Sequence, residues 1–272
     1  MSSETVKKQE GHDIYTVLRD DIMGLRLKPG IIFSIKDICE LYESGRTPVR
    51  DALIRLEQEG MITFLPQRGT MISRLDLRRI DNERFIRRSI EENVMRDFVA
   101  AFSPTVILRL EDQIQKQQEC MRAGDVRGFF ASDENFHSLF YKEMNRMYCW
   151  DVIQKECCNY KRMRLLTLML TDTDNAMVSV LEDHEAIVSA VSVRDLDKVL
   201  YWSGMHLDRI RAQEHKLLKQ FPDLFEEGTV QEQDKKGGGE LAGDFLVSIR
   251  SRGVYEIKKS KGLCCGKAKE HI

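Results

Sequence analysis

Between residues 10 and 75, the spacing of apolar positions changes from that of helices to that of strands. In three consecutive stretches apolar residues recur every three or four positions, which is typical of helices that bury one face. Two β-like runs follow, separated by the turn sequence PQRG. The expected elements are a helix from Ile14 to the LKPG sequence at 27–30, a short β-like run at 31–33, helices at 35–42 and 46–59, and strands at 61–65 and 70–73. Three helices followed by a β-hairpin is the order of a winged helix-turn-helix.

The third predicted helix carries two arginines at its beginning. If its apolar residues face the core, Arg46 and Arg50 lie one turn apart on the solvent side of the helix N-terminus. In helix-turn-helix proteins this end, with its unpaired N–H groups, points into the major groove, where arginine can bind guanine or hold phosphates. Pro48 suits the first helical turn because its missing N–H is not needed there. The two arginines are therefore candidate DNA contacts.

The alternative is that these arginines are ordinary solvated surface residues. Total charge does not separate the two interpretations, because residues 1–75 hold 11 Lys/Arg and 11 Asp/Glu. Between residues 46 and 74, however, five arginines face only three acidic residues, and Arg68 lies at the tip of the predicted hairpin. This distribution favours a nucleic-acid-binding face.

Three sequence segments in this block resemble the N-terminal domain of GntR-family transcriptional repressors. They are LKPG at 27–30, GRTPVRDALIRLEQEGMI at 45–62 and PQRGT at 66–70. The resemblance implies that arginines of the recognition helix, a basic residue early in the second helix and the glycine-tipped wing contact operator DNA. The corresponding residues are Lys36, Arg46, Thr47, Arg50, Arg68 and Gly69. The chain has Ser44-Gly45 where the family usually has Val-Ser, and Lys36 where arginine is common, so we expect weaker binding or a different operator.

From residue 80 to residue 222, helical patterns follow one another without a convincing strand. Short polar breaks such as SPT, AGD, TDTD and VRD separate them. The block is predicted to be an all-α domain of about six or seven helices, a helical bundle. The chain is thus expected to be mostly α, with an N-terminal winged helix-turn-helix and a C-terminal helical bundle.

Four polar residues in this block lie on the apolar faces of predicted helices. Asp133 and His137 are centred among phenylalanines on one helix, His184 lies centrally on a later one and His206 on the last, whereas His215 points to the opposite side of that last helix. An Asp and a His four residues apart can reach one ion, and their ligand chemistry suits Zn(II), Ni(II), Mn(II) or Fe(II). The alternative is a set of core histidines whose ring nitrogens are hydrogen-bonded within the protein, with Asp133 hydrogen-bonded to one of them. The convergence of four residues favours the metal site.

The spacing D-x3-H, a histidine 47 residues on and another 22 beyond resembles the FCD effector domain of the FadR-like branch of GntR regulators. The resemblance implies that the four residues are metal ligands and that open coordination positions accept water or a carboxylate effector. RRSIEENV at 87–94 matches the R-x3-E helix of that family, which implies that Arg87 lines the effector cavity. A surface ion pair of Arg87 with Glu91 is the alternative. Arg162 and Arg164 are further candidate effector ligands.

Composition and length add few restrictions to this picture. A chain of 272 residues favours two domains. Its 42% hydrophobic and 32% charged residues and its net charge of -2 show no global bias toward nucleic acid or membrane. The N-terminus lacks an apolar signal-type segment and no apolar run of about 18 residues occurs, so we expect an intracellular, cytoplasmic protein with no membrane partner. Seven cysteines form no C-x-x-C unit and are expected to be free thiols.

Three regions are expected: a DNA-binding domain at 10–75, an effector and dimerisation domain at 80–222, and a linker and tail at 223–272, partly disordered. The tail sequence also carries more Lys/Arg than Asp/Glu, nine against five from residue 234 on. Extra nucleic-acid contact by the tail is the alternative to a disordered extension.

The predicted function is a ligand-responsive transcriptional repressor that binds a palindromic operator as a homodimer. A zinc, nickel or manganese ion and a small organic acid are its predicted cofactor and effector. One rival is a metal-dependent hydrolase, since open positions at a three-His, one-Asp site could activate water. That rival lacks an evident general base on the inward faces and leaves the winged block unexplained. The other rival is a DNA-binding protein whose metal is purely structural.

Overall fold

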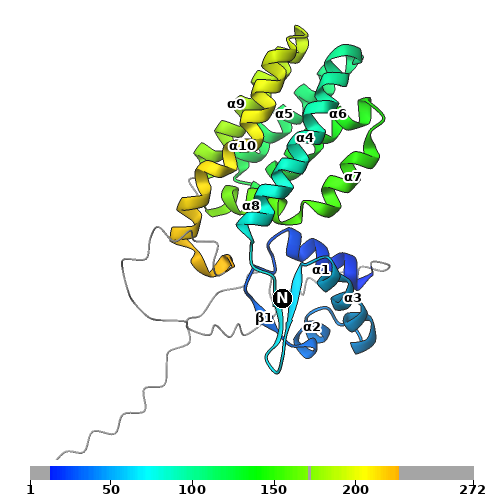
Figure 1. Ribbon diagram of the computed structural model, residues 1–272, viewed down its shortest axis with the longest axis vertical. Coiled ribbons are helices and arrows are strands. Elements are labelled where there is room, and N and C mark those ends of the chain that lie inside the picture. The colour runs from blue at the N-terminus through cyan, green and yellow to red at the C-terminus, as the bar shows by residue number, and fades with distance from the viewer. Residues whose placement is uncertain (1–12, 171–172, 227–272) are drawn as a thin grey trace, which may run out of the picture. The chain divides into compact units, whose positions relative to one another are not determined.

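The computed structural model describes residues 13–170 and 173–226. They form two compact units: residues 13–18 with 31–72, and residues 19–30 with 73–226 (Figure 1). The linker and tail expected from residue 227 onward lie outside the described residues. Within the described part, no helix has the length and apolarity needed to cross a membrane.

The first unit has the element order of a winged helix-turn-helix, as predicted. Its helices and strands are α1 (Ile14–Met23, which runs on into the second unit), β1 (Ile32–Phe33), α2 (Ile35–Leu41), α3 (Arg46–Gln58), β2 (Ile62–Leu65) and β3 (Gly69–Ile72). The β-like run at 31–33 becomes an edge strand, because β1 pairs antiparallel with β3 and the sheet order is β1-β3-β2.

Local sequence explains how the two helices of the helix-turn-helix begin. Ser34 caps α2: its side chain accepts the N–H of Asp37 at 3.2 Å, and the Asp37 carboxylate accepts the N–H of Ser34 at 2.7 Å. This reciprocal capping box pairs two of the N–H groups that every helix start leaves free. By contrast, α3 begins after Gly45, which has no side chain to cap it. The apolar face of α3 is buried as its spacing predicts, through Val49, Ala52, Leu53 and Leu56.

The wing depends on a glycine at the start of β3. Gly69 has a φ of +115°, and a Cβ atom built on it would lie 2.6 Å from the carbonyl oxygen of Phe33. A side chain would therefore clash with backbone that the β1–β3 pairing holds in place. The hairpin turn requires glycine at this position for a structural reason, whatever the wing contacts.

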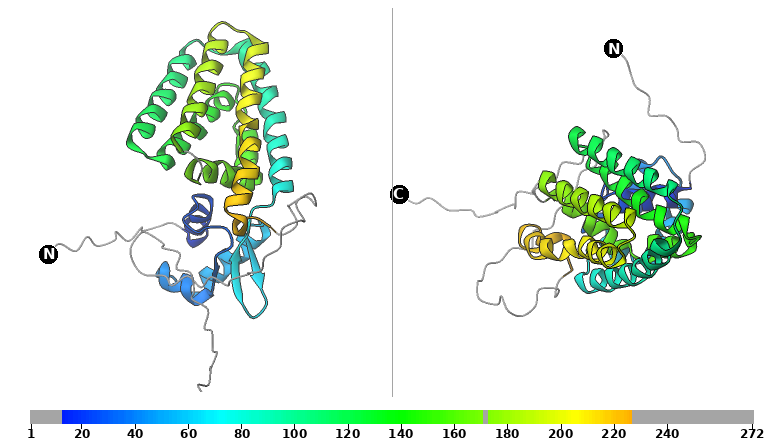
Figure 2. Two further views of the ribbon diagram at one scale, coloured as in Figure 1. Left: turned by 90° about the vertical axis from the view of Figure 1, so that its left-hand side faces the viewer. Right: turned by 90° about the horizontal axis from the view of Figure 1, so that it is seen from above.

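The second unit is all-helical, as predicted. The described residues form seven α-helices and a final 3₁₀ turn: α4 (Leu77–Ala101), α5 (Thr105–Ala123), α6 (Val126–Glu143), α7 (Met147–Glu156), α8 (Cys158–Leu170), α9 (Thr173–Ser192), α10 (Leu196–Gln220) and η1 (Pro222–Leu224). The long helices run side by side as a bundle (Figure 2). Polar residues begin several of its helices. Asp125, for example, caps α6 by accepting the N–H of Gly128.

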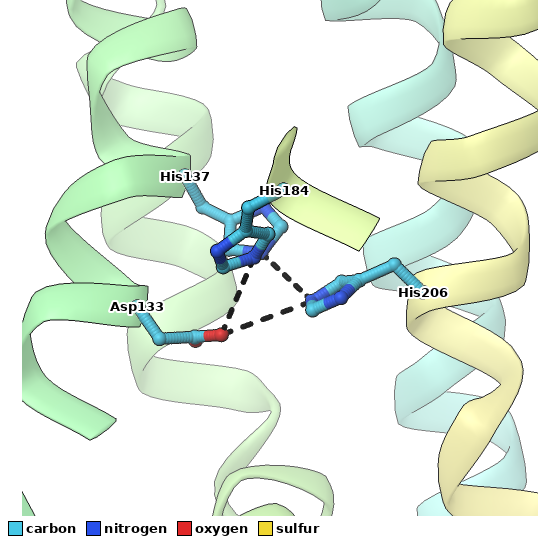
Figure 3. A group of neighbouring side chains, drawn as sticks. All are labelled: Asp133, His137, His184 and His206. Carbon is cyan, nitrogen blue, oxygen red and sulfur yellow. Dashed lines mark hydrogen bonds and ion pairs between the residues drawn. The ribbon is translucent and has the colours of Figure 1, made fainter. Parts of the chain in front are cut away.

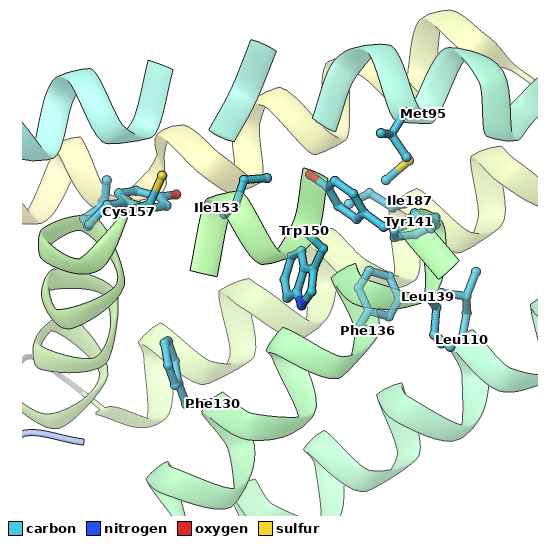
Figure 4. Close-up of a cluster of buried hydrophobic side chains, with 14 of the residues drawn as sticks. Met95, Leu110, Phe130, Phe136, Leu139, Tyr141, Trp150, Ile153, Cys157 and Ile187 are labelled. Atoms are coloured by element: carbon cyan, nitrogen blue, oxygen red, sulfur yellow. The ribbon is translucent and has the colours of Figure 1, made fainter. Parts of the chain in front are cut away.

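Aromatic side chains fill much of the bundle core (Figure 4). Phe140 meets Phe98 and Phe136 edge to face, with ring centroids 4.9 and 5.3 Å apart. Phe136 also stacks on the imidazole of His184 at 4.1 Å. The polar side chains of the bundle interior are therefore held by tightly packed rings, which limits how far they can turn.

Candidate functional site

The first candidate site is the exposed beginning of α3. Arg46, Thr47 and Arg50 are all exposed there. Neither arginine has a hydrogen-bond or ion-pair partner for its side chain within the described residues, whereas Arg55 further along pairs with Asp13 at 3.0 Å. Arg46 is the first residue of α3, whose N-terminus has no side-chain cap, and Arg50 follows about one turn later. This end of the helix therefore offers positive charge and N–H groups to an anion such as DNA phosphate.

The other residues predicted to contact DNA are also on the surface of the first unit. Lys36 is exposed on the first turn of α2 and lies 3.6 Å from Glu40 one turn later. Such an exposed i,i+4 pair is weak and leaves the ammonium group available. Arg68 is exposed in the turn between β2 and β3, next to Gly69.

The second candidate site is a buried cluster of Asp133 and His137 from α6, His184 from α9 and His206 from α10. Figure 3 shows the four side chains pointing toward one another. One ligand atom from each residue can be chosen so that all four atoms lie within 4.8 Å. The Nε2 atoms of His137 and His206 are 3.0 Å apart, and Oδ1 of Asp133 lies 3.6 Å from Nε2 of His184. Because nitrogen and oxygen ligands bind zinc at about 2.0–2.2 Å, two ligands of one ion lie roughly 3–4 Å apart.

Groups outside the cluster decide which imidazole nitrogen faces inward. Nδ1 of His137 lies 2.8 Å from a carboxylate oxygen of Glu91, and Nδ1 of His184 lies 2.9 Å from the amide oxygen of Gln117. Both oxygens only accept hydrogen bonds, so we assign the proton to Nδ1 in each ring. The Nε2 lone pairs of the two rings then point into the cluster.

His206 has the same orientation. Its Nδ1 atom lies 3.4 Å from the buried carboxylate of Asp183, and its Nε2 atom faces Nε2 of His137. Burial is the main reason why the pKa of His206 is lowered. Burial, followed by the charges of His206 and His137, holds the pKa of His184 well below its usual range. These two rings are therefore neutral near pH 7 and available as ligands.

This donor set fits a divalent cation. Two nitrogen lone pairs facing each other at 3.0 Å repel unless a proton or a metal ion lies between or beside them. The buried Nε2 of His184 has no hydrogen-bond partner in the described structure. Burial alone would raise the pKa of Asp133, but the charges of Arg164, His137 and His206 together outweigh this effect and lower it, so the carboxylate is charged. Three lone pairs and one carboxylate thus converge in ligand geometry.

Arg164 on α8 joins the cluster to a cavity. Its guanidinium donates to Asp133 and to Glu134. It also lines a cavity of about 400 Å³ that extends from Asp133 and His206 outward between α6, α8, α9 and α10. The remaining lining residues include Tyr160, Thr167, Ala176, Ser179, Met205, Arg209 and Lys216.

The three arginines predicted to bind an effector have different surroundings. Only Arg164 lines this cavity. Arg87 is fully buried and shared between Glu91 and Glu134, at 3.4 Å from each. Arg162 donates to the carbonyl oxygen of Ser73 at 3.0 Å and is not among the lining residues, and burial lowers its pKa to about 10.

Several polar residues of the site were not predicted from the sequence. Gln117 is buried on the same face of α5 as Val106, Leu110 and Ile114, so the rule that found the histidines would have found it. Arg209 follows His206 by one helical turn and reaches both the cavity and Asp183. The contact of Asp183 with His206 links two helices, and no spacing in the sequence signals it.

Family profiles match parts of both units. The profile described as "Bacterial regulatory proteins, gntR family" matches residues 11–72, and the FCD domain profile matches residues 84–209. The chain belongs to the GntR regulators that carry an FCD domain. It is a DNA-binding transcriptional regulator and not an enzyme, which removes the hydrolase alternative.

Individual proteins support this assignment. The GntR regulator is 29% identical over 214 residues to the HTH-type transcriptional repressor RspR of Escherichia coli K12, covering 79% of this chain and 92% of RspR. A regulator from an unstable DNA locus of Streptomyces ambofaciens is 27% identical, covering 82% and 92% of the two chains. E. coli McbR/YncC shares the fold, with a TM-score of 0.59, 21% identity, and coverage of 76% of this chain and 95% of McbR/YncC.

Metal content tests the buried cluster directly. We expect the purified full chain to bind about one zinc or nickel ion, and the His184→Ala/His206→Ala variant to lose it, because two of the four ligands are gone. Elemental analysis after dialysis measures the content. His215→Ala is the matched control, since that histidine is exposed on the same helix as His206. Equal metal content in the double variant would refute the site.

Proposed function

We propose that this GntR regulator is a metal-dependent repressor that binds a palindromic operator as a homodimer and responds to a small organic acid. The observation that carries the proposal is the cavity that opens onto Asp133 and His206, two members of the candidate metal cluster, in a protein that also carries a DNA-binding domain. The name of RspR as a transcriptional repressor supports the direction of regulation.

DNA recognition is assigned to the start of α3, with the wing beside it. Arg46 and Arg50 are exposed and unpaired within the described residues, so binding DNA breaks no existing ion pair. Lys36, Thr47, Arg68 and Gly69 complete the proposed surface. Because Gly45 provides no side-chain cap, the first N–H groups of α3 are open to a phosphate. The Ser44-Gly45 departure then removes one hydroxyl contact while leaving the backbone contact available.

Replacing both recognition-helix arginines should strongly weaken specific binding. A bidentate arginine–guanine contact is worth about 1–3 kcal/mol, so Arg46→Ala/Arg50→Ala should weaken binding at least ~30-fold. The assay is fluorescence anisotropy on a DNA site selected by the wild-type protein from a random pool. Arg96→Ala/Arg122→Ala, which removes two exposed arginines of the second unit, is the charge-matched control. Unchanged specific binding by the first variant would sink the assignment.

A homodimer follows from the length of the recognition helix. One 13-residue helix contacts too few base pairs for selective binding, so two half-sites are needed. Large exposed apolar residues on adjacent helices of the second unit offer a surface for a second copy. Phe85 on α4 is 66% exposed and Tyr201 on α10 is 59% exposed. These two helices are held together by ion pairs of Arg84 and Arg88 with Asp208.

A charge on α4 should therefore weaken the dimer. Burying an aromatic side chain contributes about 1.5–3 kcal/mol, and a two-fold axis brings two copies of Phe85 into the interface, so Phe85→Asp should weaken dimerisation at least 10-fold. Sedimentation equilibrium measures this change. Leu108→Asp is the control, because Leu108 is 69% exposed but lies on α5. A Phe85→Asp protein with the wild-type dimerisation constant rules out this surface.

The effector site is assigned to the cavity beside the metal cluster. Its volume of about 400 Å³ is that of a small-molecule site. Arg164 supplies a cation at its inner end, and Thr167 and Ser179 supply hydroxyl groups on its walls. A bound zinc, nickel or manganese ion would add a Lewis acid that accepts a carboxylate oxygen. Such a ligand changes DNA affinity only if it binds the DNA-competent and DNA-incompetent states unequally.

Filling the cavity should prevent effector binding. We expect a member of a panel of small carboxylic acids to raise the melting temperature of the metal-loaded protein, and a chelator to reduce the shift. Ala176→Phe should remove most of the shift because the ring occupies the space that the acid needs. Ala131→Phe, at an exposed position on α6, serves as control. If the acid stabilises Ala176→Phe as strongly as wild type, the ligand binds elsewhere; if no acid stabilises the wild type, a purely structural metal is favoured.

A further inference from the structure

We propose that Glu91 is a positioning residue for the metal site and that Arg87 acts through it. Glu91 fixes the ring of His137 so that Nε2 faces the other ligands, while Arg87 supplies the buried countercharge that Glu91 requires. This assignment rests on the metal site proposed above, and it gives Arg87 a role that needs no contact with an effector.

The contact between Glu91 and His137 joins two helices. Oε1 of Glu91, on α4, lies 2.8 Å from Nδ1 of His137, on α6, and both side chains are completely buried. A carboxylate without a proton can only accept, so the ring donates its Nδ1–H. The ring cannot rotate by half a turn without leaving the Glu91 carboxylate facing a carbon atom. Glu91 therefore selects Nε2 as the ligand atom of His137.

The second oxygen of Glu91 is also occupied by donors. The hydroxyl of Tyr141 donates to Oε2 at 3.4 Å, and Nε of Arg87 donates to the same atom at 3.4 Å. Burying a carboxylate without a countercharge is strongly unfavourable, and Arg87 provides that charge one helical turn away. The carboxylate is thereby held in one place by three groups, and its orientation is imposed on His137.

The surroundings of Arg87 agree with an internal role. The side chain is 2% exposed and does not line the cavity beside the metal cluster. Its guanidinium is shared between Glu91 and Glu134 and lies 5.7 and 5.8 Å from the ring centres of Trp150 and Tyr160. An anion bound in that cavity therefore does not lie against this guanidinium.

In the other two histidines, Nδ1 faces a weaker hydrogen-bond acceptor. His184 faces the neutral amide of Gln117 at 2.9 Å, and His206 lies 3.4 Å from Asp183, whose carboxylate is engaged by Arg209. Among the described residues, only His137 donates to a carboxylate at ordinary hydrogen-bond length. A charged acceptor makes an imidazole a stronger donor to a metal, so His137 is expected to contribute most to affinity.

Zinc affinity of the full chain tests the role of Glu91. Glu91→Gln keeps the size of the side chain but removes its charge, and loss of an outer-shell partner lowers metal affinity about 10–100-fold. Competition with a chromophoric chelator measures the dissociation constant. Glu92→Gln is the matched control, because the neighbouring residue is half-buried and pairs with Arg88 instead. Glu91→Gln with wild-type zinc affinity would overturn the proposal.

A measurement on the wild-type protein covers the case in which Glu91→Gln does not fold. In the zinc-loaded full chain, ¹⁵N NMR of the His137 ring should show a protonated Nδ1 and a zinc-bound Nε2. The opposite assignment overturns the positioning role. Failure of wild type to bind zinc would overturn the metal site and this inference together, whereas normal zinc binding with no effect of Glu91→Gln overturns the inference alone.

Discussion

The second unit depends on burying one carboxylate and three imidazoles that all present lone pairs to the same small volume. Such a group of acceptors is unstable in an apolar core unless positive charge is brought to it. Asp133 receives that charge from Arg164, while the facing nitrogens of His137 and His206, 3.0 Å apart, have no proton donor between them if each ring keeps its proton on Nδ1. The helices that carry these residues must pack closely enough to bring them together, and the phenylalanine-rich core does so.

The outer partners of the histidines extend this constraint across the bundle. Glu91 is on α4, Gln117 on α5 and Asp183 on α9, so each imidazole is tied to a helix other than its own. A shift of any of these helices changes the orientation of a ligand. The geometry of the cluster and the packing of the bundle are therefore coupled, which is the property that a sensor domain requires.

Sequence periodicity identified the fold and the inward positions because both depend on local spacing. The buried face of α3 and the inward positions of Asp133, His137, His184 and His206 follow from intervals along the helix that carries each of them. Hydrogen-bond partners of the histidines on other helices have no fixed interval along the sequence. For this reason Glu91 was predicted to pair only with Arg87, and Asp183 was not predicted at all. The different surroundings of Arg162 and Arg164 are predictable from the sequence. Residues two apart project about 200° apart on a helix, so the two side chains do not line the same cavity.

Arg164 connects the proposed metal cluster with the cavity. The same guanidinium donates to Asp133, a candidate metal ligand, and lines the cavity. An anion that enters must compete with Asp133 and Glu134 for Arg164, and a cation at the cluster competes with Arg164 for Asp133. If a cation neutralised Asp133, Glu134 would be the one remaining carboxylate on this guanidinium among the two named here, and the proposed cation and anion would favour each other's binding. By linkage, the factor by which metal increases anion affinity equals the factor by which the anion increases metal affinity.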